Sequence, residues 1–168
     1  SQNRNDRATT GMRKPNQITV DRALLLYVLH LAEPHGLLSD VKLQQLCFLC
    51  ELQMFGKGFK GFHFEFFRFA YGAFSKDLDN DLMSLRRKER VENFTLSDQA
   101  QEEVMPLLEK SIERDETNEK VTEIVKAGVT ATMAMPKLGL FLFPGRSYAG
   151  RVEVVDIGVP KEVIEDPS

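Results

Sequence analysis

The stretch that decides the fold runs from residue 75 to residue 88: Ser75-Lys76-Asp77-Leu78-Asp79-Asn80-Asp81-Leu82-Met83-Ser84-Leu85-Arg86-Arg87-Lys88. A serine before a helical pattern is a favoured N-cap, because its side-chain oxygen accepts a hydrogen bond from a backbone N–H group of the first turn. Leu78, Leu82 and Leu85 recur at helical spacing and share one face. The stretch therefore predicts a helix from Lys76 to about Lys88 with a polar outer face.

Two more helices are predicted upstream of this stretch. Thr19 is expected to cap the first, which runs through Leu31 and is apolar almost all round, so it should be central. Ser39 is expected to cap the second, whose apolar residues follow the i, i+3, i+4, i+7 rule. This buried stripe consists of Leu43, Leu46, Cys47 and Cys50.

An aromatic segment, residues 62–71, lies between the second helix and the deciding stretch. Its aromatic residues alternate and then shift phase at Phe67, which predicts a bulged strand or a strand buried on both faces. Such side chains can stack nucleic-acid bases, but we expect most of them in the core. The glycine-rich residues 56–61 are predicted to be a turn, because they lack the Lys-Ser/Thr ending of a phosphate loop.

Downstream, residues 91–96 predict a short hairpin, and Ser97 is expected to begin a fourth helix. The apolar residues of this helix are Val104, Leu107, Leu108 and Ile112. The order of helix, helix, strand, helix, hairpin and helix resembles a winged-helix plan. The predicted fold class is α+β, a mainly helical winged-helix-like module with a short β-rich C-terminal extension.

The chain divides into four predicted parts. Residues 1–18 are polar and aperiodic and predict a disordered arm, and residues 19–112 form the helical module. Residues 113–124 are rich in charge and predict a linker. Residues 125–168 predict a β-rich tail, with strands at 129–135 and 151–157 and a short buried segment at 138–143.

The composition excludes several classes of protein. No apolar run reaches the roughly 20 residues that cross a bilayer, so no membrane association is expected. The N-terminus carries no secretory pattern, which makes the cytoplasm the expected location. The net charge of −3 gives no overall polyanion-binding surface, so any nucleic-acid contact would have to be local.

The two cysteines, Cys47 and Cys50, have the spacing of half a zinc site or of a redox pair. A structural zinc site needs four ligands, and the sequence holds no second cysteine pair. Because both lie on the apolar stripe of a helix, we interpret them as core residues. No metal site, no cofactor and no catalytic residue is predicted.

The polar face of the deciding helix and its surroundings supply the candidate contacts to a nucleic acid or protein partner. They are Lys42, Arg68, Tyr71, Ser75, Lys76, Asn80, Arg86, Arg87 and Lys88. In a complex with DNA, the helix would enter the major groove with the 91–96 hairpin as wing. Asp77, Asp79 and Asp81 would repel phosphates near the helix start, so a protein partner is favoured over DNA.

A first resemblance covers residues 20–110. The motifs are Val41-Lys42-Leu43-Gln44-Gln45-Leu46-Cys47-Phe48-Leu49, then Phe64 to Leu78, then Phe94-Thr95-Leu96-Ser97-Asp98. They resemble the Panacea superfamily, which includes SocA-like antitoxins, although Gln45, Ala73 and Ser97 stand where that pattern has Lys, Pro and Thr. The resemblance implies a toxin-neutralising, adaptor or regulatory binding domain.

A second resemblance covers residues 124–165. The motifs are Ala127-Gly128-Val129-Thr130-Ala131-Thr132, Pro136-Lys137-Leu138-Gly139-Leu140, Pro144-Gly145-Arg146-Ser147-Tyr148-Ala149-Gly150 and Val155-Asp156-Ile157-Gly158-Val159-Pro160. They resemble the last part of the NAD(P)H-hydrate epimerase domain. The catalytic and nucleotide-binding motifs of that family do not occur in this sequence.

Taken together, the sequence predicts a non-catalytic binding module, most simply a protein-interaction or antitoxin-type adaptor, with a toxin as the candidate partner. A DNA-binding winged-helix regulator and a fragment or subunit related to the epimerase are the alternatives. An apolar strand in the tail would need to be covered, so a homodimer through the tail is a further candidate.

Overall fold

A computed structural model describes residues 12–36, 38–69, 72–134, 153–155 and 160–164. Helices α2 (Pro15–Ala32), α3 (Asp40–Gly56), α4 (Lys76–Arg87), α5 (Met105–Arg114) and α6 (Glu116–Ala134) make up most of this part. Shorter helical segments are η1 (Glu33–His35), the π turn η2 (Ala100–Val104) and α7 (Lys161–Ile164). The prediction of a mainly helical α+β fold is confirmed.

Within the described residues, six short strands form three two-stranded sheets. β2 (Phe67–Phe69) pairs antiparallel with β3 (Gly72–Phe74), and β4 (Val91–Glu92) pairs antiparallel with β5 (Thr95–Leu96). β1 (Phe59–Lys60) pairs in parallel with β6 (Glu153–Val154). The 91–96 hairpin is therefore confirmed, and the phase shift at Phe67 marks the start of a hairpin strand.

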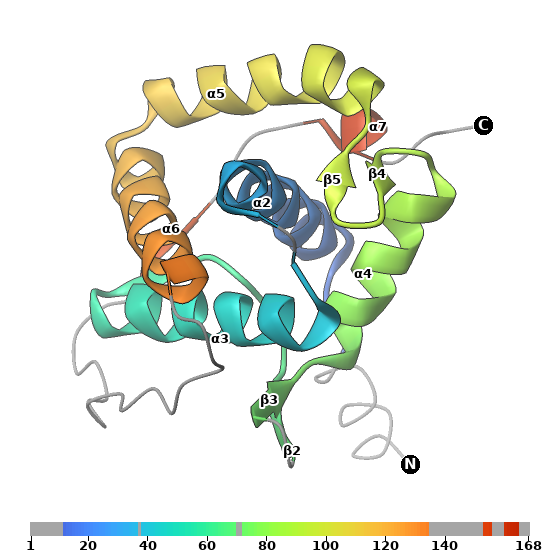
Figure 1. Cartoon of the computed structure of the whole chain (residues 1–168). Helices are drawn as coiled ribbons and strands as arrows, with labels where there is room; N and C mark the ends of the chain where they lie inside the picture. The colour runs from blue at the N-terminus through green and yellow to red at the C-terminus, as the bar shows by residue number, and fades with distance from the viewer. Residues whose placement is uncertain (1–11, 37, 70–71, 135–152, 156–159, 165–168) are drawn as a thin grey trace, which may run out of the picture.

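Helix α2 is the centre of the fold. α3, α4, α5 and α6 lie around it in Figure 1, and its residues from Thr19 to Leu29 are buried except for Arg22. This confirms the prediction of a central helix. The predicted cap at Thr19 is wrong, because the helix begins at Pro15, which suits the first helical position. Residues 15–18 are thus helical and not part of a disordered arm, while residues 1–11 lie outside the described residues.

The predicted caps of α3 and α4 are confirmed. The Ser39 hydroxyl oxygen accepts a hydrogen bond from the backbone N–H of Lys42, and that of Ser75 accepts one from Leu78. The stripe of α3 and the leucines of α4 are buried as predicted. The fourth helix begins at Asp98, directly after Ser97, and contains the π turn η2. Leu107, which was expected inside, is 41% exposed on α5.

Helix α6 is the largest departure from the sequence prediction. Residues 113–124 were expected to be a linker, but they form the end of α5 and the first half of α6. The strand predicted at 129–135 is wrong for residues 129–134, which continue α6. Val121, Val125 and Val129 are buried, so tertiary packing overrides the β propensity of these residues. Of the other predicted tail segments, 138–143 lies outside the described residues and 151–157 is described only at 153–155, where β6 lies.

Candidate binding surface

One face of α4 is open to solvent along its whole length. Lys76, Asn80, Met83 and Arg87 are exposed and follow one another at intervals of four, three and four residues. This spacing keeps them on one side of the helix over roughly 16 Å, given a rise of about 1.5 Å per residue. We call these four residues the α4 surface. Met83, 50% exposed, lies near its centre, and a cation stands at each end.

The start of α4 is fixed by α3. The side-chain amide of Gln44 accepts a hydrogen bond from the Ser75 backbone N–H at 2.8 Å and donates one to the Ser75 carbonyl at 3.0 Å. Gln44 and Ser75 are both buried, so these bonds are shielded from water. The first turn of α4 is therefore positioned by two hydrogen bonds as well as by its cap.

The middle of α4 is fixed by a buried ion-pair network. The fully buried Asp81 carboxylate accepts hydrogen bonds from the Arg13 guanidinium at 2.7 and 3.0 Å and from Nε of Arg22 at 3.1 Å. Arg13 also donates to Oδ2 of the buried Asp21 at 2.9 Å. Bidentate arginine–carboxylate contacts of this kind are geometrically specific. The network ties α4 to α2 and to the segment before α2.

The aromatic segment joins the same network. Oδ1 of Asp21 accepts a hydrogen bond from the His63 backbone N–H at 2.8 Å and lies 3.0 Å from its Nδ1. The Arg13 guanidinium lies over the Phe64 ring, 5.5 Å from its centroid. Three chain segments far apart in sequence therefore meet at Arg13 and Asp21.

The charges of the network are compensated. Desolvation lowers the pKa of Arg13, but its hydrogen bonds and charge interactions with Asp81 and Asp21 outweigh this and raise it. Burial raises the pKa of Asp81, and the two arginines oppose that rise. With two guanidinium groups at hydrogen-bond distance, Asp81 is an ion-paired carboxylate. It therefore presents no free negative charge to a partner at α4.

The end of α4 is fixed by the β4–β5 hairpin. Nε of Arg86 donates to the Asn93 carbonyl at 2.8 Å, and the guanidinium lies 5.0 Å from the centroid of the Phe94 ring. The hairpin predicted as a wing is thus attached to α4 through a predicted contact residue. Arg86 serves this attachment and leaves Arg87 as the exposed arginine of the pair.

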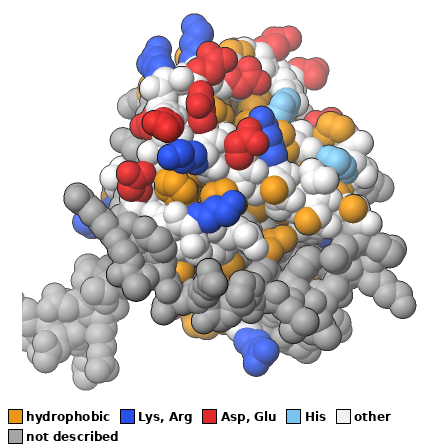
Figure 2. Space-filling model, turned by 90° about the vertical axis from the view of Figure 1, so that its left-hand side faces the viewer, with side chains coloured by type: hydrophobic (Ala, Val, Ile, Leu, Met, Phe, Trp, Pro, Cys, Tyr) orange, Lys and Arg blue, Asp and Glu red, His pale blue; other side chains and the backbone are white. Residues whose placement is uncertain are grey.

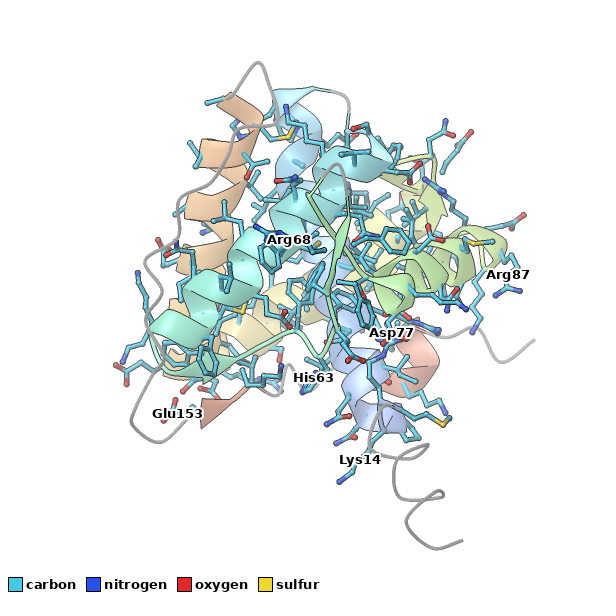
Figure 3. All side chains as sticks on the ribbon, turned by 90° about the horizontal axis from the view of Figure 1, so that it is seen from below. Lys14, His63, Arg68, Asp77, Arg87 and Glu153 are labelled. Carbon is cyan, nitrogen blue, oxygen red and sulfur yellow. The ribbon has the colours of Figure 1, made fainter. Side chains whose placement is uncertain are left out.

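The predicted contact residues do not form one cluster. Lys76, Asn80 and Arg87 share the α4 surface, and Lys88 is half-buried at its end. Ser75 is buried and occupied by the cap and by Gln44, so it is not available to a partner. Lys42 is half-buried on α3, and Tyr71 lies outside the described residues. Arg68 is exposed on β2, and Figure 3 shows it and Arg87 on different sides of Asp77.

Sequence reasoning missed Met83 and the buried network. Asp81 falls between Leu78 and Leu82 on the buried face of α4, and this position signals a paired acid. Asp21 carries the same signal, because it lies within the apolar pattern of α2. Their partner Arg13 is 68 residues from Asp81, and no local pattern connects the two.

The cysteines are core residues, as predicted. Cys47 and Cys50 are free and fully buried, and burial raises the pKa of Cys50 to about 12 and that of Cys47 well above its usual value. Both are therefore uncharged and inert thiols at neutral pH. Within the described ranges no group of three or more His, Cys, Asp or Glu side chains could hold a metal ion. Nor is any helix there long and apolar enough to cross a membrane.

Comparison with known proteins gives a short local similarity. The chain is 50% identical over 40 residues to the bifunctional NAD(P)H-hydrate repair enzyme Nnr of Moorella thermoacetica. It is 56% identical over 41 residues to the enzyme of the same name of Salinibacter ruber. Each match covers 24% of this chain and 8% of the relative. No family model and no solved structure matches the chain.

Proposed function

We propose that the chain is a cytoplasmic, non-catalytic binding module whose α4 surface contacts a protein partner. The observation that carries this proposal is the exposed Met83 near the centre of a helix face that ends in Lys76 and Arg87. Protein interfaces combine an apolar centre with a polar rim, and methionine and arginine are enriched in them. The cations at the ends suit a partner with an apolar patch flanked by carboxylates.

The contacts that hold α4 in place favour its role as a binding surface. Its start, middle and end are each held by buried or stacked contacts, namely Gln44, Arg13 and Phe94. A face that is rigid before binding loses little conformational entropy in the complex. The resemblance to the Panacea superfamily would make the partner a toxin, and it stays a prediction because no family model matches the chain.

Affinity capture from the native host with matched variants tests this function. Met83→Asp places a charge at the centre of the α4 surface, and Leu107→Asp makes the same change at an exposed position of α5. We expect one protein to be captured by the wild type and by Leu107→Asp, and to be lost with Met83→Asp. Equal capture by both variants would remove α4 from the interface.

The α4 surface also favours a second candidate, a DNA contact. Asp81 is neutralised by two arginines and Asp77 lies 3.7 Å from Arg13, so the acids near the start of α4 repel phosphates less than their number indicates. Fluorescence anisotropy with duplex DNA at several salt concentrations tests this candidate. Salt-dependent binding that is lost on combined Arg86→Ala and Arg87→Ala substitution would replace the protein partner with DNA.

The local similarity to the repair enzymes supports a third candidate, a fragment or subunit related to NAD(P)H-hydrate epimerase. A segment that matches 8% of a bifunctional enzyme does not by itself supply a complete active site. The candidate predicts that NADPH hydrate or a nucleotide raises the melting temperature of the chain. An unchanged melting temperature at saturating ligand would remove it.

Dimer formation through the tail remains a proposal, because residues 135–152 lie outside the described part. Size measurement should compare the full chain with a shortened chain that ends at Ala134, which keeps the whole of α6. A dimer that becomes a monomer on shortening would support the tail contact. A monomer in both cases would exclude it.

A further inference from the structure

A groove of about 580 Å³ lies between α5 and α6, on the side of the molecule away from α4. Tyr27 of α2 and Ile112 of α5 give it an aromatic and apolar part. Five of the residues that line it are glutamates: Glu109, Glu113, Glu116, Glu119 and Glu123.

The groove carries an excess of negative charge. Its two lysines form ion pairs along α6, Lys120 with Glu116 at 3.6 Å and Lys126 with Glu123 at 3.7 Å. Glu109 and Glu113 on α5 and Glu119 on α6 have no cationic partner among the residues that the structure places. Figure 2 shows acidic side chains gathered in the upper part of this face. Three carboxylates on two walls are therefore available to a cation.

Tyr27 is an independent feature of the same groove. Its side chain is buried, with the residue only 6% exposed, and its ring stacks on His30. Tyr27 lines the groove, and its hydroxyl makes no hydrogen bond within the described part of the chain. Burial raises the pKa of Tyr27, and the charges of Glu109 on one wall and Glu123 on the other raise it further. The phenol therefore lies under the influence of carboxylates from both helices.

The spacing of the carboxylates decides which cation fits. A divalent metal ion needs several oxygen ligands at one point, and no three acidic side chains of the described part converge in that way. Carboxylates distributed along two helices instead match positive charges that are separated from one another. An aromatic ring beneath them suits an ammonium group and its methylene neighbours.

We propose that the groove binds a linear aliphatic polyamine. Its ammonium groups pair with Glu109, Glu113 and Glu119, and its methylene chain lies over Tyr27 and Ile112. The Tyr27 hydroxyl accepts a hydrogen bond from one of the ammonium groups. This site shares no residue with the α4 surface.

Calorimetric titration of the full chain with spermidine at low salt tests the proposal. Glu109→Gln combined with Glu119→Gln removes one carboxylate from each wall, and we expect affinity to fall about threefold to tenfold, as for two exposed ion pairs. Tyr27→Phe keeps the ring and should weaken binding less. Glu102→Gln combined with Glu103→Gln, an exposed pair outside the groove, should leave affinity unchanged.

Four results would overturn the proposal. One is the absence of binding heat at millimolar spermidine, and another is an equal loss of affinity in the Glu102 and Glu103 control. A third is Mg²⁺ binding of the same strength at equal ionic strength, which would reduce the groove to a counterion surface. The fourth is a lysine-rich peptide that binds more tightly than spermidine through the same glutamates, which would assign the groove to a protein. Circular dichroism of each variant checks that it is folded.

Discussion

The α4 surface and the acidic groove lie on opposite sides of α2 and are built in contrasting ways (Figure 1). Beneath the α4 surface, charges are buried and paired, as in the contacts of Asp81 with Arg13 and Arg22. At the groove, apolar side chains such as Leu108 and Val121 hold the helices and the charges stay outside. Buried charge therefore positions a helix in one region, whereas exposed charge is available to a ligand in the other.

The largest effect is expected from removing the central carboxylate of the buried network, which tests whether buried charge positions α4. Asp81→Asn leaves Arg13 and Arg22 without their shared anion, and we expect it to lower the free energy of unfolding by about 4 kcal/mol. Asp79→Asn on the same helix is the control and should change it by less than about 0.5 kcal/mol. Urea unfolding measures both variants, and similar values for the two would show that the network does not hold α4.

At the groove, the corresponding test is to shorten a buried apolar side chain that holds α5. Leu108 is fully buried on α5. Leu108→Ala should lower the free energy of unfolding by about 3 kcal/mol, because apolar burial is lost and a cavity is left. Its exposed neighbour provides the control, since Leu107→Ala should cost less than about 0.5 kcal/mol. Chemical denaturation should give a clearly lower free energy of unfolding for Leu108→Ala than for Leu107→Ala. Equal values would contradict the packing of α5 with Leu108 inside and Leu107 outside.

A third change tests a partly buried carboxyl group whose cationic neighbour is Lys60. Burial raises the pKa of Glu51 on α3 to about 7, although Nζ of Lys60, 3.7 Å away, acts in the opposite direction. The folded state then holds a proton that the unfolded state releases near pH 4.5, so stability falls as pH rises from about 4.5 to 7.

The expected loss from Glu51 over this range is on the order of 2 kcal/mol. Glu51→Gln should remove this part of the pH dependence and leave the variant more stable than the wild type at pH 8. Melting temperatures measured between pH 4.5 and 8 provide the check. Parallel curves for the two proteins would mean that Glu51 is not protonated in the fold.

The smallest expected effect concerns the cap of α4. Ser75→Ala removes the acceptor for the Leu78 backbone N–H and should cost about 1 kcal/mol. The two hydrogen bonds between the Gln44 side chain and the Ser75 backbone, one donated by each residue, should survive. Urea unfolding measures the change in the free energy of unfolding. A decrease larger than that of Leu108→Ala would show that the cap contributes more than the hydrogen bond itself.

The sequence predicted those elements that local patterns determine. Ser39 and Ser75 cap helices as expected, and the leucine spacing of α4 gives its buried face. Helix α6 was missed because its valines and threonines favour strands locally, whereas packing on α3 decides their structure. At Gly128 a Cβ atom would lie 2.8 Å from Sγ of Cys50, so the two helices approach closely at this glycine.

The candidate surface was predicted only in part. Lys76, Asn80 and Arg87 followed from the polar face of α4, but Met83 was not recognised as its apolar centre. The network and the groove both join residues far apart in sequence, such as Arg13 with Asp81 and Tyr27 with Glu109. Only the tertiary structure brings such groups together.

Site-specific photo-crosslinking in the native host tests the role of the α4 surface most directly. A photoreactive side chain in place of Met83 should yield one major crosslinked protein, and the same group in place of Leu107 should not yield it. A product that appears from position 107 and is absent from position 83 would contradict an interface on α4.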